Sequence, residues 1–479
     1  MPTKPTDPRP SSTDAALATT ADEREEAIRS WIESSFPGTV ADLSSLVKIP
    51  SVSWDGFPAE HVRRSAEAVA ELARGTGVFE SVEVTSVPVE EGSDAHGHPA
   101  ILARRPAREG APTVLLYAHH DVQPPGDPAA WESEAFVPTV RGDRLYGRGA
   151  SDDKAGVITH IAALRAIATA TPATPLGIVL FVEGEEEFGS RSFENFLRVH
   201  RETLDADVIV VADADNWDAE TPSLTVSLRG NVTFALTVST LAHASHSGML
   251  GGAAPDAMLA ALKLLATLWD DDGTVAVDGL ASYDGPVPAS DLDRFREEAG
   301  LLDGVRPIGD GDLHRQMWFA PAITVTGIDA PSVQNASNTL LPSVRVRVST
   351  RVAPGQDAQE AFAAVRRHLE SRAPLGAHLD FDDVDTGQPF LVDTSSDVFG
   401  IARSAMADGW GAAPVDQGAG GSIPFIATLN EMFPAAKILV TGVEDPDTRA
   451  HSPNESQHLG VLRRAITAEA LLLHRLAGS

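Results

Sequence analysis

Histidine and carboxylate side chains follow four short apolar segments of this chain, and each segment has the length of a buried strand. Behind the second segment, residues 178–182, four glutamates stand within five positions. Like charges this close repel one another, and a bound cation would relieve the repulsion. The polar residues are His119 and Asp121 after 113–117, Glu183, Glu185, Glu186 and Glu187 after 178–182, Asp213 and Asp215 after 208–211, and His451 beyond 437–440.

The ends of these four segments suit a shared metal site. In an open α/β sheet, ligands bind just beyond the carboxyl ends of the strands. A His-x-Asp sequence such as His119–Asp121 suits metal binding, because a carboxylate can orient the imidazole through its second nitrogen. Each motif alone has a plainer explanation, a solvated acidic loop or surface histidines. Together, two histidines and at least three acids indicate a site for two metal ions.

A further acid precedes a predicted helix. Residues 142–154 read GDRLYGRGASDDK, a glycine-rich loop, and the apolar spacing that follows predicts a helix over 154–168. Asp152 or Asp153 could simply cap this helix. A helix start also favours an anion, so capping and metal binding are compatible. The spacing alone leaves both roles open.

Composition restricts the chemistry. The chain has no cysteine, which excludes thiol catalysis, disulfides and Cys-ligated zinc. A metal must therefore be held by His and carboxylate, which suits Zn²⁺, Mn²⁺ or Co²⁺. The formal net charge of −31 disfavours nucleic acid or an anionic membrane as a partner. No apolar run could span a bilayer and no secretory signal is recognisable, so we expect a cytoplasmic location.

The 479 residues predict more than one domain. We expect a disordered tail over 1–21, a helix over 22–36 that Pro37-Gly38 ends, a strand over 82–89, and an α/β domain with a mixed, mostly parallel sheet. After Arg229 the pattern changes: residues 224–238 and 344–352 alternate as strands, 257–268 and 356–372 have helical spacing, and 270–312 has loop composition. The predicted organisation is an α/β domain over 22–219 and 391–479, interrupted by an α+β insert over 220–390.

These motifs, in this order, resemble the M20 family of metallopeptidases, the dinuclear zinc dipeptidases and aminoacylases. The resemblance covers nearly the whole chain from about residue 24. It rests on YAHHDVQP, LYGRGASDDK, EGEEEFGS, HSGMLGG, GGSIP and the His451-Ser452 pair, and YAHHDVQP is closest to the dipeptidase branch. The resemblance implies two divalent cations, most consistent with zinc, and a lid and dimerisation domain in the insert.

It also implies residue roles. One metal would bind His119, Asp152 and Asp213, and the other would bind Asp152, Glu187 and His451, with a cis peptide after the bridging Asp152. Asp121 would orient His119, and Glu186 would be the general base. Glu185, Glu186 and Glu187 are contiguous, so their roles are assigned by aligning Gly189-Ser190 with the Gly-Ser that follows the Glu-Glu pair in the family. His246 would stabilise the oxyanion in the partner subunit of a homodimer; the substrate contacts would be Arg351, Asn338 and Ser422.

The activity implied is hydrolysis of dipeptides or short peptides; the alternative is an amidohydrolase of the same family acting on N-acyl amino acids. Three positions depart from the family pattern, Ala118, Ala155 and Ala419. None is a proposed ligand or base. Ala419 replaces a glutamate that the dipeptidase branch commonly has before Gly420, which bears on how the substrate's terminal group is recognised.

Overall fold

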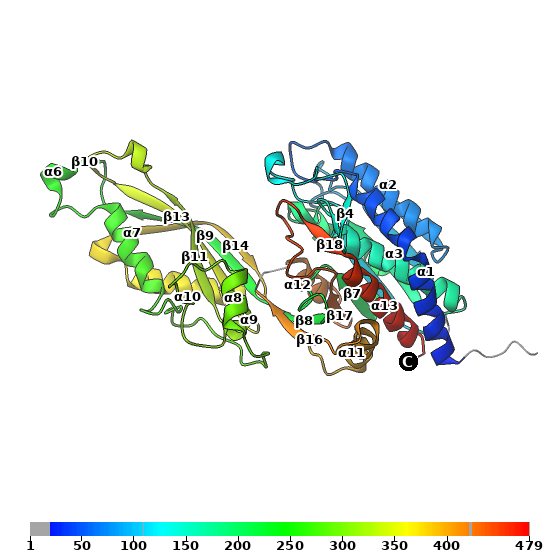
Figure 1. Ribbon diagram of the computed structural model, residues 1–479. Coiled ribbons are helices and arrows are strands. Elements are labelled where there is room, and N and C mark those ends of the chain that lie inside the picture. The colour runs from blue at the N-terminus through cyan, green and yellow to red at the C-terminus, as the bar shows by residue number, and fades with distance from the viewer. Residues whose placement is uncertain (1–19, 109, 421–423, 479) are drawn as a thin grey trace, which may run out of the picture.

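The computed structural model describes residues 20–108, 110–420 and 424–478, and these form two lobes (Figure 1). The larger lobe combines the first and the last parts of the described residues around a nine-stranded sheet. The smaller lobe is formed by the residues between them, around a four-stranded sheet. The predicted fold class, an α/β domain with an inserted α+β domain, is confirmed.

The larger sheet has the strand order β1-β2-β6-β3-β7-β17-β8-β15, and β16 pairs with β8. Its centre, β6-β3-β7-β17, is parallel, so four carboxyl ends meet at one edge. These are the four strands that the apolar segments predicted. The bounds are β1 (Ser81–Thr85), β2 (Ala100–Arg105), β3 (Thr113–His119), β6 (Gly177–Glu183), β7 (Val208–Ala212), β8 (Ser223–Leu228), β15 (Phe390–Leu391), β16 (Val415–Ala419) and β17 (Lys437–Thr441).

Helices cover both faces of this sheet because its central strands are buried on both sides. Successive strand residues point to opposite faces, so Leu116 joins one core and Leu115 the other. The first core includes α1 (Ala21–Val47), α2 (Ala59–Gly75), α3 (Lys154–Ala170), α11 (Asp397–Trp410) and α13 (Leu459–Leu476). The second includes α4 (Phe193–Val199), α5 (Arg201–Leu204) and α12 (Pro424–Met432).

The insert packs α7 (Ala257–Leu265) and α10 (Ala358–Ser371) onto an antiparallel sheet of order β11-β13-β9-β14. Its strands are β9 (Gly230–Ser239), β11 (Ala322–Asp329), β13 (Ser343–Val352) and β14 (His378–Gly387). Two short helices, α8 (Leu292–Glu298) and α9 (Leu313–Phe319), lie at the junction, where α9 packs on β16. At the far end of the insert, away from the larger lobe, lie β10 (Ser245–His246), α6 (Ser247–Leu250) and the partner of β10, β12 (Thr339–Leu340) (Figure 1).

A small three-stranded sheet completes the larger lobe. Strands β4 (Thr139–Arg141) and β5 (Arg144–Tyr146) form a hairpin that pairs with β18 (Ser456–His458). This pairing ties the loop before α3 to the C-terminal segment that follows His451. None of the described helices has the length and apolar character needed to cross a membrane.

Several local predictions were wrong. Pro37 lies inside α1 and does not end a helix, because Ile28, Ile32, Leu43 and Leu46 are buried on either side of it and their packing outweighs the lost backbone hydrogen bond. The alternating segment 224–238 is two strands in two sheets, so the larger sheet continues beyond residue 220 and the chain crosses to the insert at Arg229. The predicted strand over 82–89 is the shorter β1, and the predicted loop over 270–312 contains α8. Most of the tail predicted over 1–21 lies outside the described residues, and α1 already begins at Ala21.

Candidate metal centre

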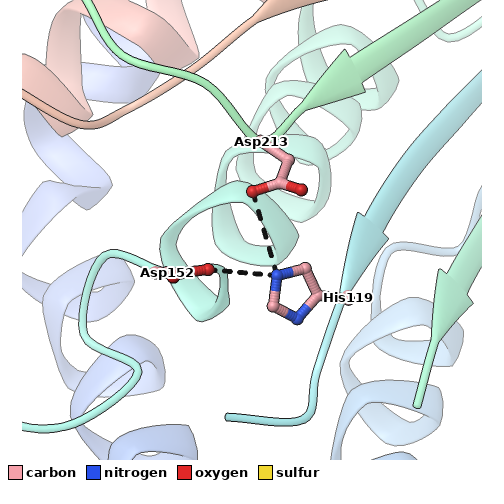
Figure 2. Close-up of side chains that lie close together, drawn as sticks. All are labelled: His119, Asp152 and Asp213. Atoms are coloured by element: carbon pink, nitrogen blue, oxygen red, sulfur yellow. Dashed lines mark hydrogen bonds and ion pairs between the residues drawn. The ribbon is translucent and has the colours of Figure 1, made fainter. Parts of the chain in front are cut away.

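The carboxyl ends of β3 and β7 place a histidine and an aspartate beside Asp152, which precedes α3 (Figure 2). His119 is the last residue of β3, and its Nε2 lies 3.1 Å from Asp152 Oδ1 and 3.8 Å from Asp213 Oδ1. His119 is buried, whereas the Asp213 side chain is 18% exposed. These three residues, predicted as one ligand set, form a cluster that could hold a cation.

A second cluster shares Asp152. His451 Nε2 lies 2.9 Å from Asp152 Oδ2 and 3.3 Å from Glu187 Oε2. Within each cluster the candidate ligand atoms lie within 4.8 Å of one another. One oxygen of Asp152 therefore faces His119 and the other faces His451, which is the arrangement a bridging carboxylate needs.

The donor set fits divalent cations of the zinc type, because it combines imidazole nitrogens with carboxylate oxygens. Burial raises the pKa of Asp213 to about 6 and that of Glu187 to about 10, and the negative charge of Asp152 adds to both shifts. Burial also opposes ionisation of Asp152, but hydrogen bonds from His119 and His451 lower its pKa overall. Two dications in these clusters would offset the repulsion among the carboxylates.

The loop carrying Asp152 is held by a residue that the sequence analysis missed, Glu455. One carboxylate oxygen of Glu455 accepts the backbone N–H of Ser151 at 3.1 Å and of Asp152 at 3.2 Å. The other accepts the N–H of Gly149 at 3.1 Å and Arg148 Nη1 at 2.6 Å. Glu455 is fully buried and stands four positions after His451, so this carboxylate connects the two ends of the metal centre.

The two adjacent aspartates have separate roles. The peptide between Asp152 and Asp153 is cis, as the resemblance implied. Asp153 caps α3 by accepting the N–H of Gly156 at 3.1 Å, and its second oxygen accepts the N–H of His119 at 3.1 Å. Capping therefore falls to Asp153, which leaves the carboxylate of Asp152 between the two histidines.

Asp121 orients two parts of the centre. Its Oδ1 lies 3.4 Å from His119 Nδ1, which leaves Nε2 facing the candidate ligands. Asp121 also accepts the N–H of Glu186 at 3.2 Å and the N–H of Glu187 at 3.1 Å, and Ser53 Oγ donates to it at 2.7 Å. The acidic turn after β6 is thereby fixed to the same aspartate as His119.

The three consecutive glutamates point in different directions. Glu187 faces His451, and Gln123 donates to it from its backbone at 3.1 Å and its side chain at 2.7 Å. Glu186 Oε2 lies 4.0 Å from His119 Nε2, with its side chain 22% exposed. Glu185 turns away to accept from Ser192 and from the N–H of His98.

Two of the residues predicted to act on the substrate, His246 and Asn338, lie away from this centre. His246 is exposed in β10, and the carbonyl of exposed Asn338 accepts the N–H of Ser247 at 2.9 Å, so both lie at the far end of the insert. Arg351 is half-buried and pairs in register with Asn231, near the crossing to the larger lobe. Ser422 lies outside the described residues.

The fold and the two candidate ligand clusters suit a metal-dependent hydrolase. The sequence pattern of peptidase family M20/M25/M40 matches residues 115–475, about three quarters of the chain, and the chain belongs to this family. The resemblance noted from the motifs is thereby confirmed.

Characterised relatives agree with that membership. The chain is 34% identical over 403 residues to the cysteinylglycine-S-conjugate dipeptidase of Corynebacterium striatum, covering 81% of this chain and 88% of the relative. It is 25% identical over 464 residues to the Beta-Ala-His dipeptidase of Homo sapiens, covering 91% and 86%. The fold is similar to that of the di-peptidase Dug1p from Saccharomyces cerevisiae, with a TM-score of 0.76 at 21% identity over 95% of this chain and 99% of that one. The predicted enzyme class, an M20-type dipeptidase, is confirmed.

Proposed function

We propose that the protein hydrolyses the peptide bond of dipeptides of the cysteinylglycine type, including S-substituted forms, with two divalent cations bound to the two clusters. The position of Asp152 between His119 and His451 carries the two-metal part of the proposal. The relatives that act on cysteinylglycine and its S-conjugates support the substrate class. Zinc suits the donor set, and manganese or cobalt would fit the same residues.

Bound cations would lower the pKa of a water molecule and polarise the scissile carbonyl. Glu186 is the residue that moves protons: it accepts one from the attacking water and returns it to the nitrogen of the leaving amine. Burial raises the pKa of Glu186 well above its ordinary value, and nearby Asp213 adds to that shift. The backbone hydrogen bond to Asp121 keeps the Glu186 carboxylate beside the ligand clusters.

The matched pair Glu186→Gln and Glu185→Gln tests this assignment. Glu186→Gln keeps the shape of the side chain but cannot accept a proton, so it should bind metal normally and lose roughly 10²–10⁴-fold in kcat. Glu185→Gln changes a side chain that faces Ser192 and His98 and should keep most of the turnover. Turnover of Cys-Gly, measured with the metal content of each variant, decides the matter. A fully active Glu186→Gln enzyme would remove Glu186 from the role, and hydrolysis of N-acyl amino acids in place of dipeptides would refute the substrate class.

We further propose that the protein is a homodimer in which His246 serves the partner's metal centre, donating a hydrogen bond to the developing oxyanion. Within one chain, β10 lies at the far end of the insert (Figure 1). Apolar side chains are exposed on the neighbouring segments: Met249 and Leu250 of α6 are 79% and 47% exposed, and Val333, six residues before β12, is 97% exposed. Such exposure marks a surface for association.

Complementation between two inactive variants separates action within one chain from action across the interface. Glu186→Gln and His246→Ala are each expected to be nearly inactive alone. In a mixed dimer, the site with intact Glu186 receives His246 from the other chain, so mixing should restore activity. A monomer by light scattering, or a mixture as inactive as its components, would contradict the proposal.

A further inference from the structure

A cavity of about 550 Å³ lies where the larger lobe meets the insert. The larger lobe contributes the loop after β7, together with Gln417 and Pro446, and the insert contributes the segment that carries α8 and α9. A volume of this size is within the range of small-molecule sites, roughly 300–1,000 Å³. No residue given a catalytic or metal-binding role above lines it.

Aromatic rings form one part of its wall. The ring of His314 on α9 packs against two tryptophans, with centroid distances of 5.1 Å to Trp217 and 4.7 Å to Trp318, and the two tryptophan rings lie 6.3 Å from each other. Phe295 and Met317 also line the cavity. Arg294 Nη2 donates to the carbonyl of Trp217 at 3.0 Å, so α8 is fastened to the loop of the larger lobe. These contacts make a wall that suits an apolar or aromatic group.

The cavity adjoins the metal centre. Asp215 lines it and stands two residues after Asp213, and two residues span at most about 7 Å. Asp215 also pairs along the backbone with Glu444, which follows β17 at the same edge of the sheet. A dipeptide bound at the two ligand clusters therefore has one of its side chains within reach of the cavity.

Charge selects which residue of the dipeptide faces it. Three acids and one arginine line the cavity, and Arg294 is paired with Glu298 at 2.7 Å, which leaves Asp215 and Asp291 as the excess carboxylates. The excess of negative charge attracts the free α-ammonium group of a dipeptide and repels its carboxylate. The N-terminal residue is thus the one placed next to the cavity, and an anionic side chain is disfavoured there.

We infer that this cavity receives the side chain of the N-terminal residue of the substrate, and that it suits a bulky uncharged thioether such as an S-benzyl or S-alkyl cysteine. A cysteine thiol would leave most of the space unfilled, so S-substituted cysteinylglycine is the better substrate. The inference rests on the proposed dipeptidase function, and it assigns to this cavity the enzyme's preference for the N-terminal side chain of the substrate.

Ala289→Trp tests the inference by filling the cavity. Ala289 is exposed and lines it, so the substitution adds volume without removing a contact. The measured quantity is the ratio of kcat/KM for S-benzyl-Cys-Gly to kcat/KM for Cys-Gly. It should exceed one in the unmodified protein and fall about tenfold or more in Ala289→Trp, since even one methylene in an apolar pocket changes selectivity by roughly 10–200-fold. Ala299→Trp is the control, because Ala299 is exposed in the same segment and lies outside the cavity lining; it should leave the ratio unchanged.

The outcomes separate this inference from the proposed function. If the unmodified protein does not hydrolyse Cys-Gly or its S-benzyl form, the proposed function fails. If it hydrolyses both and Ala289→Trp leaves their ratio unchanged, the function stands and the cavity assignment is overturned. Gly-Phe carries its bulk on the second residue, so a loss confined to Gly-Phe in Ala289→Trp would overturn the assignment to the N-terminal side chain.

Discussion

Glu455→Gln should both destabilise the protein and weaken metal binding, because one carboxylate supports the loop that carries Asp152. A glutamine offers one acceptor oxygen, and its NH₂ group would face either Arg148 and Gly149 or Ser151 and Asp152. Arg148 is only 1% exposed, so its guanidinium would lose a buried partner. Removing one member of a buried ion pair costs about 3–5 kcal/mol, and we expect a loss of that size in the free energy of unfolding.

The effect on metal binding has a separate cause. The carboxylate of Asp152 lies between the two candidate ligand clusters, and its backbone N–H donates a hydrogen bond to Glu455. Substituting residues that orient metal ligands typically lowers metal affinity about 10–100-fold. Urea unfolding of the metal-free protein measures the loss of stability. Competition with a chelator of known affinity, in the absence of urea, measures the loss of metal affinity.

Glu469→Gln is the matched control. Glu469 is also a buried carboxylate paired with a nitrogen donor, since both of its oxygens lie 2.9 Å from His160 Nδ1, but none of its hydrogen bonds within the described residues reaches the loop that carries Asp152. It should lower stability without changing metal affinity. The reasoning is refuted if Glu455→Gln unfolds like the unmodified protein, or if both variants weaken metal binding to the same extent.

Three further predictions concern metal, pH and the first helix. Complete chelation should abolish turnover and lower Tm, and Zn²⁺, Mn²⁺ or Co²⁺ should restore both, with about 2.7 kcal/mol of stability from each site whose ion is at 100 times its Kd. Turnover by the fully chelated protein would contradict this. Burial lowers the pKa of His160, but attraction to Glu469 and hydrogen bonding outweigh it and raise that pKa overall. The unmodified protein should therefore be more stable than Glu469→Gln by its full margin below about pH 6.5, and this margin should shrink as the pH rises through the raised pKa of His160. Urea unfolding of both proteins at pH 6 and pH 9 measures the margin, and a larger margin at pH 9 would contradict the prediction. Pro37→Ala should raise the midpoint of urea unfolding, because proline inside a helix is about 3 kcal/mol less favourable than alanine. The greater conformational entropy that alanine gives the unfolded chain offsets part of this gain. A lower midpoint would show that the surrounding packing requires proline.

Local pattern was enough to predict the strands that deliver the site. β3, β6, β7 and β17 are short apolar runs that end in polar residues, and a parallel sheet brings such ends together whatever the rest of the fold. The metal clusters themselves were predicted through the family resemblance, since no spacing connects His119 to His451 across more than three hundred positions. The glutamate register was likewise set by Gly189-Ser190, and the structure places Glu187, not Glu185, beside His451.

Other features depend on contacts that a linear pattern does not contain. Nothing in the alternation of 224–238 shows that the chain changes sheets at Arg229, because both halves have the same period. Pro37 continues a helix only because α1 is packed along the core on both sides of it. Glu455 and Gln123 are polar residues whose partners come from distant segments. For Glu455, the sequence offered one indication of a role at the metal centre, its position four residues after His451.

The position of β17 in the sheet has a consequence for how the protein is made. This strand lies between β7 and β8, although it is synthesised more than two hundred residues after them. During translation the insert, which is continuous in the chain, can fold while a gap remains between β7 and β8. A nascent chain therefore lacks its last central strand and His451 until residues 437–451 have been synthesised. Products terminated before this segment would be inactive and would expose an unpaired strand edge to proteolysis and aggregation.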